Sequence, residues 1–399
     1  MPKVDARDPA LFSAPHKSSG RYIYIACPWT PKGGGMFKVA DYLIQTQAKT
    51  TPSHAAELRP LDTRGDASAL GSLWVLTTAI GRLVKGKFSG QLAGVHVNMA
   101  ERLSLFRKCT LIITSRALGI PVVLHLHAAQ LHHFYQCLPG PLKALTRWVF
   151  SIANSCIVLG TASRQFVNAT LKVPPQKIQI LINGVPETTE PRRQSSADTN
   201  AIQQVLFVGN LSHRKGVSDL LQALALPGFD SDRIKVTLAG GGDVAAYQAQ
   251  AVKLGLDRWV RFAGWTSQAQ VAQLMSQADV FVLPSYDEGL PLVILEALAN
   301  GVAVVCSPVG EIPSILSDKV HAVFVQAGDV KGIAAALQKV LQQPTFRQEL
   351  ERNGRALYAQ NFSLLRFFSD VARIHQQHFG ISAVARLTAD TRTVEQVNP

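Results

Sequence analysis

Residues 280–301 limit most strongly what this chain can fold into. They open with the apolar run V-F-V-L, which is short and β-prone, like a buried parallel strand. A turn containing Gly289 follows, and strong helix formers run from Leu292 until Asn300-Gly301 ends them. A strand, a glycine turn and a helix N-terminus form an anion site, because free amides and the positive end of the helix dipole face one point.

Two carboxylates flank this turn, Glu288 within it and Glu296 inside the following helix. At a rise of about 1.5 Å per residue, the helical spacing separates them by roughly 10–12 Å. This separation matches the reach from a ribose across a diphosphate to a sugar. The arrangement therefore indicates a site for a nucleotide-sugar.

The segment E-G-L-P-L-V-I-L-E, preceded by P-S-Y-D, resembles the E-x7-E motif of retaining GT-B glycosyltransferases, specifically glycosyltransferase family 4 (group 1). The resemblance implies an α/β fold of two Rossmann-like domains that face each other across a cleft, with a C-terminal helix crossing back to the first domain. It also implies that Glu288 contacts the donor sugar and Glu296 the ribose, with no metal ion and no cofactor besides the donor substrate. The alternative interpretation is an ordinary strand–turn–helix with two surface carboxylates.

The composition is that of a globular protein, with 47% hydrophobic and 17% charged residues in 399, enough for two domains with full cores. The five cysteines are scattered without a C-x-x-C pair, which favours reduced thiols and a cytosolic setting. The first residues lack the apolar core of a signal peptide, and no run of eighteen apolar residues occurs. We therefore expect a cytoplasmic protein that does not span a membrane.

The positive charge lies almost entirely in the first half. Residues 1–190 hold 21 Lys and Arg against 9 Asp and Glu, whereas residues 191–399 hold 19 against 18. Such asymmetry favours an extended anionic partner, which can be a membrane surface, a diphosphate lipid or nucleic acid. A basic solvated face without a partner is the alternative.

Strand-like and helix-like runs alternate along the chain, which predicts parallel sheets with crossover helices. We expect a flexible leader at 1–20 and an N-terminal, acceptor-side Rossmann-like domain at 21–187. A linker at 188–203 then leads to the nucleotide-sugar-binding Rossmann-like domain at 204–362. A crossover helix at 363–380 and a disordered tail at 381–399 complete the prediction.

Basic residues after the first strand of the second domain are candidate phosphate ligands. Lys215 lies in G-N-L-S-H-R-K-G, where a compact cation on a glycine loop suits a diphosphate. The family pattern G-R…K-G implies that Arg and Lys contact the phosphates. Lys215 matches it, but Asn210 stands where Arg is usual, and Arg214 is the candidate replacement. A solvated Arg-Lys pair is the alternative.

Several loop residues complete the expected donor site. The family resemblance adds Gly34 and Gly35 in the loop after the first strand, and Gly241 and Asp243 in a second-domain glycine loop. Gly289 and Leu290 supply amides at the helix start.

His127 is the third candidate catalytic residue, beside Glu288 and Lys215. In P-V-V-L-H-L-H-A-A, His125 and His127 share one face of a strand, and His127 falls at its C-terminal end, where open parallel sheets bind ligands. The resemblance implies that His127 contacts the donor sugar. Zinc binding is the rival reading of this histidine-rich stretch, although it lacks the usual zinc spacing, and a purely structural role is the alternative for His125.

The predicted reaction is metal-independent transfer of a hexose, with retention, from a UDP-sugar or GDP-sugar to a sugar or lipid-linked saccharide acceptor. An undecaprenyl-diphosphate-linked acceptor in bacterial envelope or extracellular polysaccharide assembly fits the basic first half, which would lie on the inner face of the cytoplasmic membrane. The alternatives are a non-enzymatic protein that binds nucleic acid or membranes and a GT-B nucleotide-sugar epimerase. We expect no nucleic-acid partner, because no helix-turn-helix, RNP or zinc-finger pattern appears.

Overall fold

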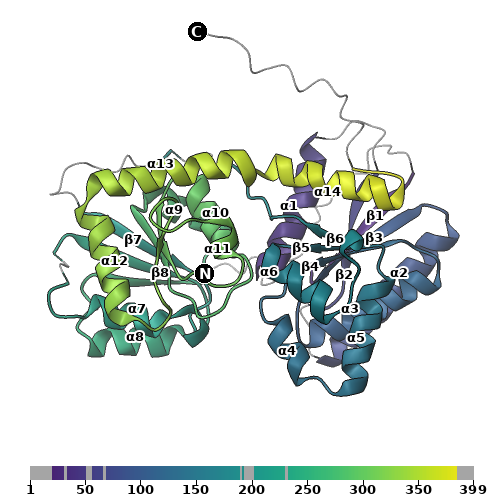
Figure 1. Cartoon of the computed structure of the whole chain (residues 1–399), viewed down its shortest axis with the longest axis horizontal. Helices are drawn as coiled ribbons and strands as arrows, with labels where there is room; N and C mark the ends of the chain where they lie inside the picture. Colours follow the sequence, from purple (N-terminus) through teal and green to yellow (C-terminus); the bar gives the residue numbers. More distant parts are fainter. Residues whose placement is uncertain are drawn as a thin grey trace, which may run out of the picture.

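The computed structural model consists of two lobes joined at one side (Figure 1). It describes residues 20–30, 34–50, 56–65, 69–188, 191–192, 202–229 and 232–383. The predicted leader except residue 20, most of the predicted linker and the tail beyond residue 383 lie outside the described residues.

The first domain is built on a six-stranded parallel sheet in the order β2-β1-β3-β4-β5-β6. Its strands are β1 (Tyr22–Cys27), β2 (Glu57–Asp62), β3 (Leu92–Met99), β4 (Val122–Leu126), β5 (Ser155–Val158) and β6 (Ile178–Ile180). Its helices are α1 (Gly34–Thr50), α2 (Ala69–Phe88), α3 (Leu103–Ala117), α4 (Leu131–Cys137), α5 (Gly140–Ile152) and α6 (Thr161–Gln165), which runs into a π-helical turn. The central strands β1, β3, β4 and β5 are buried along their whole length, as expected of a sheet covered on both faces.

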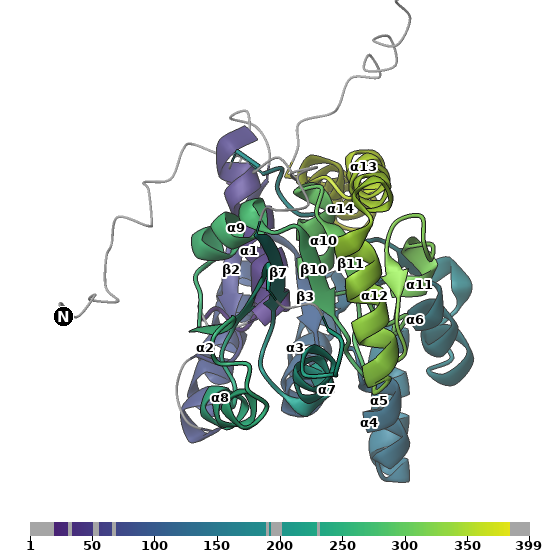
Figure 2. The same ribbon diagram turned by 90° about the vertical axis from the view of Figure 1, so that its left-hand side faces the viewer.

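The second domain repeats this plan with the strand order β12-β11-β10-β7-β8-β9. Its strands are β7 (Gln203–Val208), β8 (Ile234–Ala239), β9 (Val260–Gly264), β10 (Val280–Leu283), β11 (Ala303–Cys306) and β12 (Val323–Phe324). The helices are α7 (Val217–Leu224), α8 (Val244–Lys253), α9 (Gln268–Gln277), α10 (Leu292–Ala299), α11 (Ile312–Ile315), α12 (Val330–Gln342) and α13 (Pro344–Asn361). Figure 2 looks onto this domain and shows its helices on both sides of β7 and β10. The prediction of two Rossmann-like domains is confirmed.

A long helical segment joins the domains on one side (Figure 1). α13 packs on the second domain against α10, and α14 (Leu364–Phe379) packs on the first against α1 and β4. Ser363 lies between them and caps α14 by accepting a hydrogen bond from the Arg366 amide at 3.4 Å. The expected helix that crosses back to the first domain is therefore confirmed.

The chain passes between the domains a second time beside this junction. Val185 pairs with Ser363 in a parallel bridge, and the Tyr358 hydroxyl donates to the Val185 carbonyl at 3.1 Å. A Cβ on Gly184 would lie 2.6 Å from the Phe367 Cβ, so only glycine allows the two crossings to approach this closely. The two crossings pack against each other around Val185 and Ser363, and this junction is called the hinge below.

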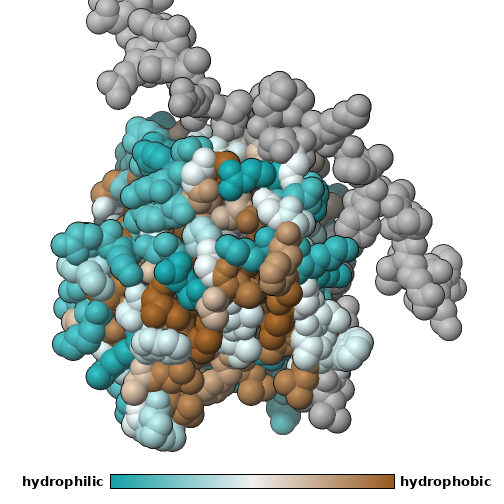
Figure 3. Space-filling model, turned by 90° about the vertical axis from the view of Figure 1, so that its right-hand side faces the viewer, coloured by the Kyte–Doolittle hydropathy of each residue, from teal (hydrophilic) through white to brown (hydrophobic). Residues whose placement is uncertain are grey.

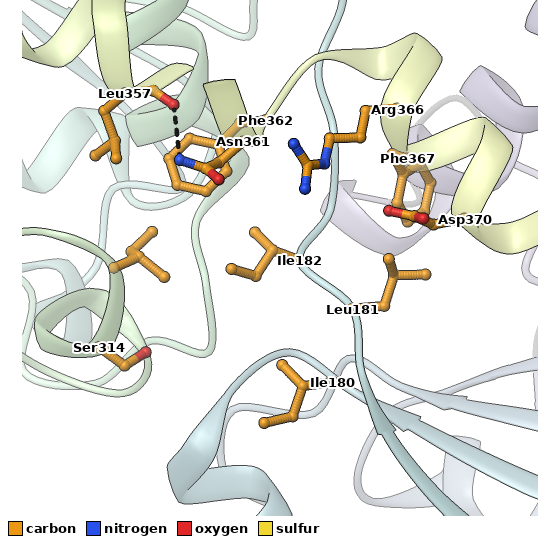
Figure 4. A pocket seen from close by; sticks show the side chains of 11 residues that line it. Ile180, Leu181, Ile182, Ser314, Leu357, Asn361, Phe362, Arg366, Phe367 and Asp370 are labelled. Carbon is orange, nitrogen blue, oxygen red and sulfur yellow. Dashed lines mark hydrogen bonds between the residues drawn. The ribbon is translucent and has the colours of Figure 1, made fainter. Parts of the chain in front are cut away.

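A cavity of about 320 Å³ opens at this hinge. Figure 4 shows Ile182 and Arg366 from the two crossings on its walls, with Ser314 of α11 below them. No residue of the Glu288 turn lines it. The cavity is therefore a feature of the hinge and not the expected donor site.

Candidate active site

Glu288 lies at the centre of a buried ionic network in the turn between β10 and α10. Its side chain is only 7% exposed, and Oε1 accepts hydrogen bonds from Lys215 Nζ and from Ser285 Oγ, the latter at 2.7 Å. The Arg214 guanidinium lies 3.6 Å from Oε2 and donates to the Asp287 carbonyl at 2.6 Å. The two basic residues predicted to bind phosphate thus stand beside the carboxylate predicted to bind the sugar.

Two glycines with positive φ allow the loops around Glu288 to pack closely. A Cβ on Gly216 (φ 66°) would lie 2.1 Å from the Pro284 carbonyl oxygen, and one on Gly310 (φ 60°) would lie 2.0 Å from the Glu288 carbonyl oxygen. Only glycine fits either position without moving the neighbouring backbone. The position of Glu288 is therefore set by backbone on both sides.

Glu296, on α10, faces the first domain. Its Oε1 accepts a hydrogen bond at 2.5 Å from Lys38 Nζ on α1, while its buried Oε2 has no hydrogen-bond partner among the described residues. One turn along α1, the Tyr42 hydroxyl accepts at 2.5 Å from Gln268 of α9. Burial, followed by the charge of Glu296, raises the pKa of Tyr42 far above its usual value. The shielded carboxylate of Glu296, held by Lys38 and close to Tyr42, is an acceptor suited to a ligand hydroxyl.

The N-termini of two helices approach each other across the cleft. Gly34 and Gly35 are the first residues of α1, and a Cβ on Gly35 would lie 3.8 Å from Leu292, the first residue of α10. Both helix dipoles present their positive ends here, beside Lys215 and Lys38. The junction can therefore stabilise an anion such as a diphosphate.

The remaining predicted second-domain residues lie around the neighbouring loop ends. Asn210 is exposed, and its Oδ1 would be 3.1 Å from a Cβ on Gly242, so its side chain covers the glycine loop that contains Gly241. Asp243 caps α8 by accepting a hydrogen bond from the Ala246 amide at 3.4 Å. Asp243 thus has a structural role in the ligand-free chain.

His127 stands at the end of β4, next to the Glu288 turn. A Cβ on Gly289 would lie 3.6 Å from the His127 carbonyl oxygen, which brings the two predicted sites together across the cleft. Asn98 Oδ1 lies 2.8 Å from His127 Nε2, and the Asn98 amide group donates to the Ala26 carbonyl at 3.5 Å. Since that bond turns the Asn98 oxygen toward the ring, Nε2 carries the proton and Nδ1 is left as an acceptor.

A chain of buried histidines supports His127 from behind. The His127 ring centroid lies 4.0 Å from that of His125, and His125 Nδ1 is 3.2 Å from His96 Nε2. His96 Nδ1 in turn lies 2.9 Å from Nε2 of His375 on α14. Burial lowers the pKa of His96 and of His127 to about 3, so the rings are neutral at pH 7. Within the described residues no group of three His, Cys, Asp or Glu side chains could hold a metal ion.

Glu311 connects the donor turn to the first domain. It is 2% exposed, its Oε1 accepts from the Ser163 amide at 2.7 Å, and its Oε2 accepts from the Ala162 amide at 3.3 Å. The Glu311 amide donates to the Gly289 carbonyl at 2.9 Å. The turn that carries Glu288 is thereby fixed to the start of α6 in the opposite domain.

Sequence reasoning missed Lys38, Tyr42 and Glu311. The signal available for the first two was their four-residue spacing, which places both on one face of the helix after the glycine loop. Their partners lie more than 200 residues away in the sequence, and no local pattern reveals such a pairing.

Comparisons with known proteins agree with this geometry. Residues 188–357 match the model of the family "Glycosyl transferases group 1". An uncharacterized glycosyltransferase of Methanocaldococcus jannaschii is 26% identical over 250 residues, covering 59% of this chain and 64% of the relative. The putative teichuronic acid biosynthesis glycosyltransferase TuaC of Bacillus subtilis is 26% identical over 245 residues, covering 60% and 59%. The chain spans about three fifths of the length of these curated relatives.

The fold is also that of solved glycosyltransferase structures. Anabaena HepE, in complex with UDP and glucose, superposes with a TM-score of 0.69 at 17% identity, covering 89% of this chain and 99% of that one. The family match covers Lys215, Glu288 and Glu296, the residues that form the second-domain side of the cleft. Over residues 188–357 the chain is therefore similar to the group 1 glycosyltransferases.

Proposed function

We propose that this chain transfers a hexose, with retention and without a metal ion, from a UDP-sugar or GDP-sugar to a saccharide acceptor. One observation carries the proposal: Glu288, in the turn before α10, and Glu296, within α10, lie on either side of the helix N-terminus, with Lys215, Arg214 and Lys38 beside them. Glu288 is placed for sugar hydroxyls, and the unpartnered Oε2 of Glu296 for a ribose hydroxyl. The diphosphate would lie between them, at the converging N-termini of α1 and α10.

The chemical task is to stabilise the diphosphate as it leaves. The bond between the anomeric carbon and the phosphate oxygen breaks, and negative charge develops on the diphosphate. Lys215, Arg214 and the amides near Leu290 would offset that charge from fixed positions, which is where preorganised dipoles contribute most. These groups supply the stabilisation that a metal ion supplies in other enzymes.

Retention requires the acceptor oxygen to bond to the anomeric carbon on the face that the diphosphate leaves. The proton of the acceptor hydroxyl passes to the departing phosphate oxygen, so that no enzyme base is needed. Glu288 is already engaged by Lys215 and Ser285, a setting that suits holding hydroxyls better than attacking carbon. His127 would accept a hydrogen bond from a sugar hydroxyl at Nδ1, since Nε2 is engaged by Asn98.

The relatives favour UDP and an envelope polysaccharide. HepE was solved with UDP and glucose, and TuaC is named for teichuronic acid biosynthesis. We extend these to this chain as a UDP-hexose donor and a lipid-linked saccharide acceptor, such as an undecaprenyl-diphosphate-linked one, in polysaccharide assembly.

A lipid-linked acceptor implies that the first domain lies on an anionic membrane. No helix of the described residues is long and apolar enough to cross a bilayer. Residues 67–186 contain 12 Lys and Arg but a single acidic residue, Glu101. On α2, Trp74 and Phe88 are 73% and 81% exposed, and Lys85, three residues before Phe88, is exposed too. Figure 3 views the end of the molecule that carries this domain and shows hydrophobic patches breaking the hydrophilic surface. Exposed aromatic and basic side chains together suit an anionic lipid surface.

The experiment that tests the function is a transfer assay with the variant Glu288→Gln, using UDP-hexoses as donors and following product by NMR. We expect the rate to fall by about 10²–10³-fold, because a carboxylate of the donor site loses its charge. Asp287→Asn, a neighbouring carboxylate outside the network, should keep the wild-type rate. Near-full turnover by Glu288→Gln, a product with inverted anomeric configuration, or epimerised nucleotide-sugar without transfer would each overturn the proposal.

A further inference from the structure

The face of α3 that looks toward the end of β2 carries a cluster of basic residues that form no salt bridge with a carboxylate of the described residues. Ser104, Arg107 and Lys108 are three and four residues apart and so lie side by side on the helix. Lys108 is 0% exposed, and its Nζ donates to the Thr63 hydroxyl, just beyond β2. The α3 face therefore meets the carboxyl end of the first sheet, where parallel α/β sheets bind ligands.

Buried cations normally have an anionic partner, since transfer of an unpaired charge from water is costly. No described carboxylate forms a salt bridge with Arg107 or Lys108. The nearest candidate, Asp62, has both oxygens engaged by backbone amides, including that of Gly65 at 3.1 Å. Ser104 Oγ and Arg107 Nε are buried without a hydrogen-bond partner in the described structure. The cluster thus offers donors that nothing in the described chain accepts.

The ionisation of these groups reflects their burial. Burial lowers the pKa of Lys108 to about 7; Cys27 and Asp62 raise it and the charge of Arg107 lowers it, each by less than burial. Burial and the charge of the exposed Arg64 lower the pKa of Arg107, and Asp62 raises it by less. A bound anion would favour the charged form of each group.

The cluster lies next to the reaction centre. The charge of Lys108 is close enough to His127 to contribute to lowering the pKa of that histidine, after burial and His96. Lys108 and His127 both lie at the carboxyl edge of the first sheet, on the side opposite the donor turn. Because the donor diphosphate would lie at Lys215 and Arg214, an anion bound at Lys108 would belong to the acceptor, which meets the donor sugar near His127.

We propose that Arg107 and Lys108, with Ser104 and Arg64, bind a phosphate or diphosphate group of the acceptor, beside the hydroxyl that receives the sugar. The inference rests on the proposed function for its biological meaning, but the anion site can be tested without any transfer reaction. The same chemistry would serve a prenyl diphosphate lipid or a soluble sugar phosphate. Arginine and lysine together suit phosphate oxygens, the first as a fork of donors and the second as a compact charge.

The test is a calorimetric titration of the whole chain with inorganic diphosphate, which also reaches the donor site. We therefore compare wild type with Lys215→Ala, which removes the donor-site cation, and with Arg107→Gln and Lys108→Met, which remove cations from the cluster. Lys108→Met keeps an apolar chain of similar length in the buried position and is expected to fold. Arg116→Gln, on the far end of the same helix, is the matched control for loss of one charge.

We expect two binding sites in wild type. Lys215→Ala should keep the cluster site, whereas Arg107→Gln and Lys108→Met should each weaken it by about tenfold or more, the loss expected for a charge-assisted hydrogen bond. Arg116→Gln should bind like wild type. A single site that disappears in Lys215→Ala, or equal affinity in Arg107→Gln and wild type, would overturn the proposal, whereas failure of the transfer assay alone would not.

A second arm identifies the source of the phosphate. Farnesyl diphosphate is titrated in parallel with glucose 1-phosphate, both in the Lys215→Ala background. Tighter binding of the prenyl compound assigns the site to a lipid diphosphate, and tighter binding of the sugar phosphate assigns it to a soluble acceptor. If both compounds bind the Arg107→Gln variant as tightly as its parent, the cluster is not their binding site.

Discussion

The two domains share one architecture but differ in whether their basic residues have carboxylate partners. In the second domain, basic residues at the cleft have acidic partners in the chain: Lys215 pairs with Glu288, and Arg214 lies beside the same carboxylate. In the first, Arg107 and Lys108 have no carboxylate partner among the described residues, and histidines fill the core behind His127. In the proposed function, the second domain would hold the donor among charges that are already paired. The first domain would bind an anion that the described residues do not supply.

The largest expected difference between the domains is the loss of stability at low pH that the buried histidines behind His127 cause. Burial holds the pKa of His96 and His127 near 3 and those of His125 and His375 well below the usual value, so the folded chain keeps these rings neutral. In the unfolded chain they bind protons below about pH 6.5. Stability is therefore fully present above that pH and falls by about 1.4 kcal/mol per pH unit for each histidine as the pH drops toward 3.

Urea unfolding of the whole chain between pH 7 and pH 5 measures this slope. His375→Phe should reduce the number of protons taken up on unfolding by about one, because residue 375 then no longer titrates. His133→Asn, at an exposed position of α4, should leave the slope unchanged. An identical slope in His375→Phe and wild type would show that the buried chain does not control acid stability.

The contact between the domains should have the next largest effect. Lys38→Met removes the cation that orients Glu296, so we expect the donor KM to rise by about tenfold with a smaller change in kcat. Lys38→Arg should recover most of the loss, because the charge remains. Lys49→Met, in the last turn of the same helix, should resemble wild type. If steady-state kinetics give the same donor KM for Lys38→Met and wild type, α1 does not contribute to the nucleotide site.

The smallest expected effect concerns the outer surface of the first domain. Trp74→Ser and Phe88→Ser, on α2, should each reduce sedimentation with phosphatidylglycerol vesicles several-fold, and Lys85→Gln should weaken binding by about 1 kcal/mol. Val252→Ser on α8 is the matched control, since that side chain is 62% exposed on the other domain. Binding that does not change with salt, or that falls equally in Val252→Ser, would argue against docking by α2.

Sequence patterns predicted the fold and the strand–turn–helix around Glu288 because both depend on local order. The strand, the glycine turn and the helix around Glu288 are contiguous in the chain, and alternation of strands and helices sufficed for the parallel sheets. β2 was missed because Pro60 breaks its pattern, although an edge strand tolerates proline. Asp243 was predicted to bind the donor, and in the structure it caps α8.

Contacts across the cleft could not be predicted in the same way. Lys38 and Glu296 are 258 residues apart, and Glu311 meets α6 from 148 residues away. Such pairs are set by how the domains pack, and a single sequence carries no record of that packing. The buried position of Lys108 is similar: its helix was predicted, but the face it turns toward the sheet end depends on tertiary structure.

The central claim, a nucleotide-sugar site that needs no metal, is tested most directly by thermal unfolding against UDP-, GDP-, ADP- and CMP-sugars in the presence of a chelator. A ligand that binds only the folded chain at a hundred times its dissociation constant adds about 2.7 kcal/mol of stability. We predict a selective rise in Tm with UDP- or GDP-sugars that Glu296→Gln strongly reduces. A flat panel, or a rise that appears only when a divalent cation replaces the chelator, would contradict the claim.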